Sequence, residues 1–314
     1  MKPLVDGVVH PGNAALLAGC LAPDSVALAV TSPPYLVGKG YEIDATEQSW
    51  TDVLRATFRG VGAALVPGGF LAVNINDILA FPDPDLPRVN AENARARKHN
   101  VTRADIQAVI DAAPAPPSRA SLARHFAVSE QTIDRRLRGV NIRGGKRTVQ
   151  TRVRLCGPTV VDAAAGGGLY LYDRRAWAKG PAWTNSPWHA TSYRAVDEFE
   201  YIYLFHKPGP LRYDRGRLDG AEWGQWGSRG VWQVPSVAAN NDHEARFPDE
   251  IPRRLIRLLS DPGDVILDPF AGSGTTLRVA ADLGRRWIGF EIDPKWASTA
   301  SHAAREASLR SLSA

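Results

Sequence analysis

The sequence has 314 residues, of which 44% are hydrophobic and 23% charged, and this is the composition of a globular protein with a sizeable core. Its two cysteines, Cys20 and Cys156, form no Cys-x-x-Cys pattern, which argues against a disulfide scaffold, a zinc site and secretion. We find neither a signal peptide nor an apolar run long enough to span a membrane, so we expect a cytoplasmic protein.

Positive charge is concentrated in one block of the chain. The net charge is +5, but residues 88–154 carry fifteen Lys or Arg against five Asp or Glu, a net of +10. The remaining 23 basic and 28 acidic residues leave the rest of the chain at −5. A contiguous basic block of this kind predicts contact with nucleic acid.

The first chemically informative stretch is Thr31-Ser32-Pro33-Pro34-Tyr35. It follows the apolar run 26–30, which is typical of a buried parallel strand. Two prolines cannot continue a sheet ladder, so the chain must turn at the strand's carboxyl end, where open α/β sheets bind their ligands. The turn offers a hydroxyl, carbonyls and an aromatic face to a flat amine. A Pro-Pro loop with a packed tyrosine explains the same five residues, and they do not decide between the two.

The next elements continue an α/β pattern. Helical spacing of Trp50, Leu54, Phe58 and other apolar residues predicts a helix over 49–65, and residues 70–75 form the next strand. This strand–helix–strand unit is the building block of a doubly wound sheet.

A Pro-rich linker, 81–87, leads into the basic block, where three short helices are predicted. Ser118 caps the second helix and Ser129 caps the third, which runs from 130 to 138. Two capped helices joined by a tight turn, with a basic outer face, are typical of a helix-turn-helix. The third helix is expected to present Gln131, Thr132, Arg135 and Arg136 outward. A small packing module with a solvated basic face is the alternative.

After the block, residues 200–205 predict another strand, and residues 213–232 form an irregular stretch rich in Gly, Arg and Trp. Its tryptophans are Trp223, Trp226 and Trp232. They are compatible with a surface that faces a substrate and equally with burial in the hydrophobic core. The pattern alone leaves both open.

The second informative stretch lies near the C-terminus. A short strand, 265–267, is followed by the glycine-rich turn 268–276, a helix, a strand at 287–290 and then Glu291. This order is typical of the nucleotide-binding unit of a Rossmann-like sheet, in which the glycines allow close approach of a ligand and the acid binds ribose hydroxyls. The turn lacks the full Gly-x-Gly-x-x-Gly, and a glycine-rich turn with a purely structural role is the alternative. Asp268 stands where a pyrophosphate would approach, so a cationic nucleoside such as S-adenosylmethionine (SAM) fits better than a dinucleotide.

Together, Thr31–Tyr35 and Asp268–Thr276 resemble the catalytic and SAM-binding motifs of the DNA amino-methyltransferases, and their order resembles the permuted β group. The resemblance implies a Rossmann-like, doubly wound methyltransferase sheet formed by residues 1–87 and 155–314. The helix-turn-helix-like block, 88–154, is then a DNA-binding insertion that departs from the usual family plan.

The resemblance also implies roles for particular residues. The catalytic turn comprises Ser32, Pro33, Pro34 and Tyr35. The cofactor SAM is expected to contact Thr31, Phe247, Asp268, Pro269, Phe270, Gly272, Gly274, Thr275 and Glu291. Contact with double-stranded DNA is expected from Lys39, Gln131, Thr132, Arg135, Arg136, Arg138, Lys146 and Arg147, and no metal is expected.

The expected reaction is methyl transfer to an exocyclic amine of a base flipped out of the duplex and stacked on Tyr35. Ser32 and the carbonyl of Pro33 are expected to accept the two amine hydrogens. Adenine enzymes of the family generally carry Asp where Ser32 stands, so we expect N4-methylation of cytosine, with N6-methylation of adenine as the alternative.

Other interpretations are open as well. A methyltransferase of protein glutamine or of RNA adenine uses a related Pro-Pro-Tyr turn, but the order of the motifs opposes it. A DNA-binding regulator on an inactive methyltransferase scaffold is an alternative of another class. We also expect a cognate restriction endonuclease that does not bind this protein physically. The protein itself is expected to be a monomer or a homodimer.

Overall fold

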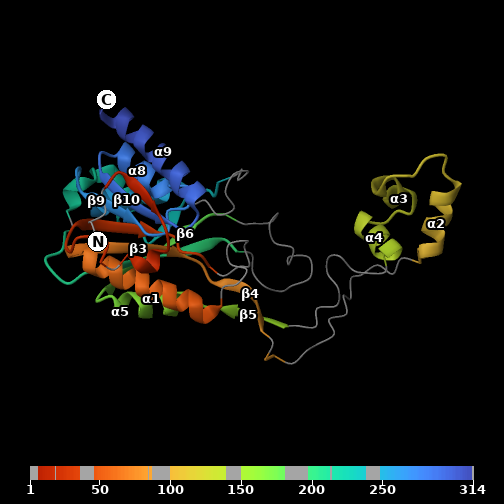
Figure 1. The fold of residues 1–314 in the computed structure, drawn as a ribbon, viewed down its shortest axis with the longest axis horizontal. Coiled ribbons are helices and arrows are strands. Elements are labelled where there is room, and N and C mark those ends of the chain that lie inside the picture. Colours follow the sequence, from red (N-terminus) through yellow and green to blue (C-terminus); the bar gives the residue numbers. More distant parts are fainter. Residues whose placement is uncertain are drawn as a thin grey trace. The chain divides into compact units, whose positions relative to one another are not determined.

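The computed structural model describes residues 6–17, 19–35, 46–83, 85–86, 100–138, 150–180, 197–212, 214–237 and 248–312. The chain divides into two units (Figure 1). The sheet unit comprises residues 1–79 and 153–314, and the helical unit comprises residues 80–152. Two short strands, β4 (Ile78–Asp83) and β5 (Gln150–Arg154), pair where the chain passes between the units.

An eight-stranded sheet organises the sheet unit, with the strand order β1-β10-β9-β2-β3-β7-β6-β8. The first five strands in this order run parallel, while β7 is antiparallel to both β3 and β6. The strands are β1 (Val8–Pro11), β2 (Val26–Thr31), β3 (Leu65–Ile75), β6 (Tyr170–Ala178), β7 (Phe199–His206), β8 (Val231–Gln233), β9 (Val265–Asp268) and β10 (Arg286–Glu291).

Helices cover both faces of the sheet, and this confirms the predicted α/β class (Figure 1). One face packs against α1 (Glu47–Ala64) and α5 (Gly157–Gly166). The other packs against α7 (Glu250–Leu259), α8 (Thr275–Asp282) and α9 (Pro294–Leu312). The helix expected over 49–65 thus begins two residues earlier, because Thr46 caps it through the backbone N–H of Ser49 at 3.0 Å.

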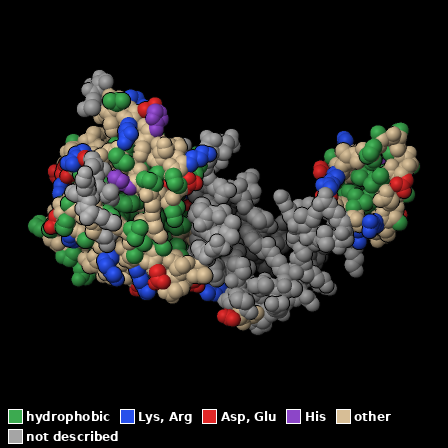
Figure 2. Space-filling model, viewed as in Figure 1, with side chains coloured by type: hydrophobic (Ala, Val, Ile, Leu, Met, Phe, Trp, Pro, Cys, Tyr) green, Lys and Arg blue, Asp and Glu red, His purple; other side chains and the backbone are tan. Residues whose placement is uncertain are grey.

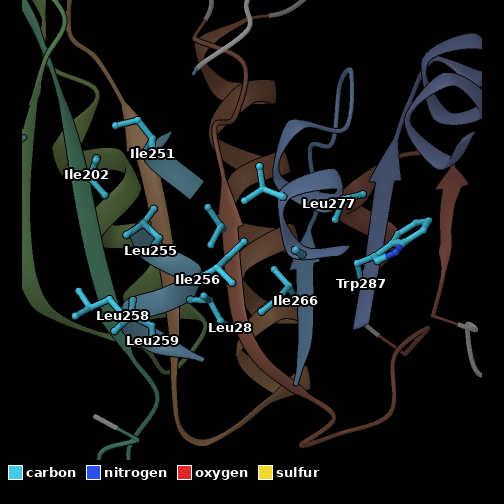
Figure 3. Packing of buried hydrophobic residues seen from close by; sticks show 14 of the residues in the cluster. Leu28, Ile202, Ile251, Leu255, Ile256, Leu258, Leu259, Ile266, Leu277 and Trp287 are labelled. Carbon is cyan, nitrogen blue, oxygen red and sulfur yellow. The ribbon is translucent and has the colours of Figure 1, made fainter. Parts of the chain in front are cut away.

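The central strands alternate between two cores. Leu28 points into the α7–α9 core and Ala29 into the α1–α5 core, as the two-residue period of a strand requires. Figure 3 shows Leu28 and Ile266 of adjacent strands facing Leu255 and Ile256 of α7. Because both faces are covered, these strands are almost entirely apolar, and a polar residue inside them stands out.

The Gly-, Arg- and Trp-rich stretch is more regular than its sequence suggested. It contains η3 (Arg215–Arg217), α6 (Gly220–Glu222), a π-helical turn, η4 (Trp223–Gly227), and strand β8. Trp226 and Trp232 are buried, and both belong to the core against α7. These two tryptophans are therefore part of the hydrophobic core and do not face a substrate.

The helical unit has its own small core. Helices α2 (Arg103–Ala112), α3 (Arg119–His125) and α4 (Glu130–Arg138) enclose Ile106, Leu122 and Ile133. The turn before α4 contains Ala127 with φ of 53°, a left-handed conformation that reverses the chain tightly. Among the helices of the described ranges, none is long and apolar enough to cross a membrane.

Candidate active site

The site lies where the sheet changes the direction of its winding. Strands β2 and β9 are parallel neighbours, and the next helices along the chain pack on opposite faces of the sheet. The helix after β2 is α1, and the helix after β9 is α8. Between two such strands the loops diverge and leave a crevice at their carboxyl ends, which is where open α/β sheets bind ligands. Both informative stretches of the sequence begin at these two strand ends.

A direct hydrogen bond joins the two stretches. Thr31, the last residue of β2, donates its hydroxyl hydrogen to Asp268 Oδ1, at 2.7 Å. Asp268 is the last residue of β9, and the backbone N–H of Phe270 donates to the same oxygen at 3.1 Å. Both side chains are buried, with exposed fractions of 0% for Thr31 and 2% for Asp268.

Burial makes Asp268 an unusual carboxyl group. Loss of hydration raises its pKa to about 6, although the hydrogen bond from Thr31 pulls the pKa down. A buried carboxylate held at a ligand crevice is a good partner for a cation, because the cation restores the stabilisation that water would otherwise provide.

The glycine-rich turn after β9 has two residues in left-handed backbone conformation. Gly272 and Gly274 have φ of 51° and 83°, left-handed values that favour glycine. The N–H of Gly272 donates to Glu291 Oε2 at 2.8 Å, so the carboxylate at the end of β10 is fixed beside the turn. Pro269 is buried, Phe270 is half-buried, and Thr275 begins α8, so all the described members expected to contact SAM lie on this turn or at the ends of β2 and β10.

The Ser-Pro-Pro-Tyr turn is anchored from α1. Trp50 donates its indole N–H to the carbonyl oxygen of Pro34 at 2.6 Å, and Arg154 lies over the Trp50 ring. Pro33 is buried, whereas Ser32, Pro34 and Tyr35 are half-buried. Ser32 Oγ lies 3.0 Å from Tyr35 Oη, so the two polar atoms of the predicted catalytic turn are in hydrogen-bond contact.

A polar cluster behind Tyr35 was not predicted from the sequence. Tyr35 Oη donates to Glu200 Oε2 at 3.0 Å, and the amide nitrogen of Asn74 donates to both Tyr35 Oη and Glu200 Oε2. Lys179 Nζ donates to Glu200 Oε1 at 3.0 Å and to Asp197. The one feature of the sequence that could have indicated this cluster is Asn74, a polar residue within an otherwise apolar strand.

Several residues expected to bind DNA lie elsewhere or outside the described structure. Thr132 is in the helical unit, and its predicted outward orientation is wrong. The residue is only 8% exposed, and its hydroxyl is in hydrogen-bond contact with Oγ of Ser129, just before α4. Arg136 is exposed on the same helix. The side chains of Gln131, Arg135 and Arg138, and all of Lys39, Lys146, Arg147 and Phe247, lie outside the described residues.

Comparison with known proteins identifies the family. The model of the N6_N4_Mtase family, described as DNA methylase, matches residues 26–302. The chain belongs to this family. It is a DNA methyltransferase, and the family's methyl donor is SAM.

Individual relatives agree with this membership. The chain is 51% identical to the type II methyltransferase M.BglI of Bacillus subtilis over 287 residues, which cover 91% of this chain and 82% of that enzyme. It is 26% identical to TTHA0409 of Thermus thermophilus in complex with SAM, with a TM-score of 0.60 and coverage of 96% and 94%. The PvuII methyltransferase, titled cytosine-N4-specific, shares the fold at 19% identity, with a TM-score of 0.55 and coverage of 99% and 94%.

The donor set at the crevice fits SAM. Asp268 is a buried carboxyl group that gains from a cation, and Glu291 is a fixed carboxylate whose oxygens can each accept further hydrogens. In SAM, the ammonium and sulfonium groups would be the partners of Asp268, and the ribose diol would be the partner of Glu291. When bound there, SAM supplies an electrophilic methyl group.

The raised pKa of Asp268 predicts a particular dependence of stability on pH. The folded state holds the proton more tightly than the unfolded chain, so Asp268 supports stability at acidic pH and this support is lost as the pH rises through about 6. We expect Asp268→Asn to raise the free energy of unfolding of the ligand-free sheet unit at pH 8, by up to about 3 kcal/mol. The gain should shrink toward pH 4. Urea unfolding followed by tryptophan fluorescence reports on the sheet unit alone, because all nine tryptophans lie outside residues 80–152.

A matched control is Asp264→Asn, which breaks the ion pair with Arg212 at 3.2 Å and should lower stability at pH 8. Calorimetry with SAM provides the second measurement, and we expect weaker binding because a neutral amide at position 268 stabilises a cation much less than a carboxylate does. A variant Asp268→Asn that is less stable at pH 8 and binds SAM as tightly as the unaltered protein would contradict the assignment.

Proposed function

We propose that the protein transfers the methyl group of SAM to the N4 amine of cytosine in double-stranded DNA, as a permuted β-group enzyme. The observation that carries the proposal is the contact between the two turns. Thr31 Oγ1 lies 2.7 Å from Asp268 Oδ1, so the residue before Ser32 touches the proposed SAM-binding turn. An amine held at Ser32 and a methyl donor held at Asp268 are then neighbours.

Orientation explains what this arrangement contributes to the reaction. The exocyclic amine is a poor nucleophile, because its lone pair is delocalised into the ring. Ser32 Oγ and the carbonyl of Pro33 accept its two hydrogens and direct the lone pair out of the ring plane. Trp50 holds the turn through the carbonyl of Pro34. Holding two reactants in line contributes up to about 7–11 kcal/mol in well-aligned systems.

The choice of cytosine rests on Ser32. Where adenine enzymes of the family generally have an aspartate, this chain has a serine. N6-methylation of adenine is the alternative, since a hydroxyl oxygen accepts an amine hydrogen from either base. The presence of Ser32, Tyr35, Asp268 and Glu291 opposes a DNA-binding regulator on an inactive scaffold.

The relative M.BglI is a type II methyltransferase, and this supports a role in a restriction–modification system. In such a system a cognate endonuclease cuts the unmethylated site, and the two enzymes act on the same DNA without binding one another. We propose that the enzyme acts as a monomer or homodimer.

We propose that the helical unit and its flanking segments bind the DNA. Residues 100–138 carry six basic and four acidic residues, and side chains of both signs lie on the face seen in Figure 2. The flanks, 88–99 and 139–154, carry nine basic residues and one acidic residue. Most of the basic excess is therefore in the flanks, which favours phosphate contacts by residues such as Lys146 and Arg147.

Analysis of the methylated nucleoside tests the proposed reaction. DNA is incubated with SAM carrying a labelled methyl group, digested to nucleosides and analysed by mass spectrometry. We expect label in N4-methyldeoxycytidine, and we expect Ser32→Ala to reduce it at least tenfold while SAM still binds. Label in N6-methyldeoxyadenosine would overturn the choice of base. Intact binding of SAM and DNA without any labelled nucleoside would favour the regulator.

The dependence of DNA affinity on salt tests the proposed contacts. Removing one basic side chain that binds a phosphate should flatten the plot of log K against log salt by about 0.9. Replacing Lys146 and Arg147 together by Gln should therefore reduce the slope by about 1.8. The control is Arg310→Gln on α9, whose side chain is 61% exposed and which should leave the slope unchanged. Equal slopes for the double variant and the unaltered protein would show that these two residues do not contact phosphates.

A further inference from the structure

The polar cluster behind the Ser-Pro-Pro-Tyr turn determines which way its hydrogens point. Tyr35 Oη is within hydrogen-bond distance of Ser32 Oγ, Glu200 Oε2 and the carbonyl oxygen of Asn74, at 3.0, 3.0 and 3.3 Å. A phenol has one hydrogen to donate. The question is which of the three acceptors receives it.

The charge on Glu200 decides the direction. Lys179 Nζ lies 3.0 Å from Glu200 Oε1, and the two side chains are only 14% and 13% exposed, so Glu200 is the anionic partner in a largely buried ion pair. A carboxylate only accepts hydrogens. If the tyrosine hydrogen pointed elsewhere, two oxygens with lone pairs would face each other at 3.0 Å inside the protein, with no hydrogen between them.

The state of Tyr35 supports the same direction. Burial and the nearby charge of Glu200 raise the pKa of Tyr35 well above its ordinary value, so the phenol keeps its hydrogen at neutral pH. Asn74 helps to hold the pair, because its amide nitrogen donates to Tyr35 Oη at 3.1 Å and to Glu200 Oε2 at 2.7 Å.

The consequence falls on Ser32. Because Tyr35 donates its hydroxyl hydrogen to Glu200, the contact between Ser32 Oγ and Tyr35 Oη requires the serine to be the donor. Its one hydrogen is then used in the bond to Tyr35 Oη, and its lone pairs remain to accept hydrogens from a substrate.

We propose that Glu200 is a positioning residue that, through Tyr35, makes Ser32 a hydrogen-bond acceptor toward the amine to be methylated. This inference rests on the proposed role of Ser32, and it refines that role. A serine fixed in this way presents only acceptors, as an aspartate would, and does not donate to the ring N3 of cytosine. It holds the amine of either base.

Glu200→Gln should reverse the chain of hydrogen bonds. Lys179 attracts the amide oxygen of the new side chain, which turns its NH2 group toward Tyr35 Oη. Of the two acceptors left to Tyr35, Ser32 Oγ at 3.0 Å is nearer than the carbonyl oxygen of Asn74 at 3.3 Å, so Tyr35 donates to Ser32 and the serine hydrogen points at the amine hydrogens of the base. We expect the single-turnover rate of methyl transfer to fall at least tenfold, with the Kd for SAM and for DNA changed less than twofold.

A double-mutant cycle with Tyr35→Phe tests whether Glu200 acts through the tyrosine hydroxyl. We expect Glu200→Gln to change the rate less than twofold when position 35 is already Phe. The control is Asp197→Asn, which removes one charge on the other side of Lys179 and should change the rate less than threefold. Equal losses from Glu200→Gln with Tyr and with Phe at position 35 would overturn the proposal.

Two further comparisons separate the possible failures. Glu200→Asp keeps the negative charge and the acceptor, so it should retain more activity than Glu200→Gln. The opposite order of activities would also overturn the proposal, even if Glu200→Gln folded poorly. The rates are measured as tritium transferred to DNA. An unaltered protein that transfers none refutes the proposed function, whereas an active protein with independent effects at positions 35 and 200 refutes only the role of Glu200.

Discussion

The hydrogen bond between Thr31 Oγ1 and Asp268 Oδ1 is the interaction on which the site depends. It joins the ends of two neighbouring parallel strands whose residues are 237 positions apart in the chain. The sheet order makes the contact possible, because β2 and β9 are adjacent and their loops diverge to opposite faces. One strand end carries the turn proposed to hold the amine, and the other carries the turn proposed to hold the methyl donor.

Two carboxyl groups at this site are buried in different ways. Glu200 is paired with Lys179, so its charge is balanced within the protein. Asp268 has no such pair among the described residues, and burial raises its pKa to about 6. The protein thus tolerates a carboxyl group that is costly to ionise at neutral pH, and a cationic ligand offsets that cost. Stability and binding make opposite demands on Asp268, which is common at sites built for ligands.

The sequence predicted the parts of the fold that depend on local pattern. The apolar runs around Leu28 and Ile266 indicated buried strands, and the turns that follow them lie at the carboxyl ends of the neighbouring parallel strands β2 and β9. Thr132 was misplaced: helical spacing suggested a surface position, but the residue is buried, and its N–H and hydroxyl both contact the Ser129 side chain. The Tyr35 cluster was missed, since Asn74, Lys179 and Glu200 come from three separate parts of the chain whose strand pairing no local pattern reveals.

The central claim is that bound SAM places its methyl group beside the Ser-Pro-Pro-Tyr turn. An isotope-filtered NMR experiment with SAM labelled by carbon-13 in the methyl group measures this directly, through nuclear Overhauser effects to the protein. We predict effects from that methyl group to Ser32 and to Tyr35, and their assignment can be checked with Ser32→Ala. Effects to residues of the 268–276 turn, with none to residues 31–35, would contradict the claim.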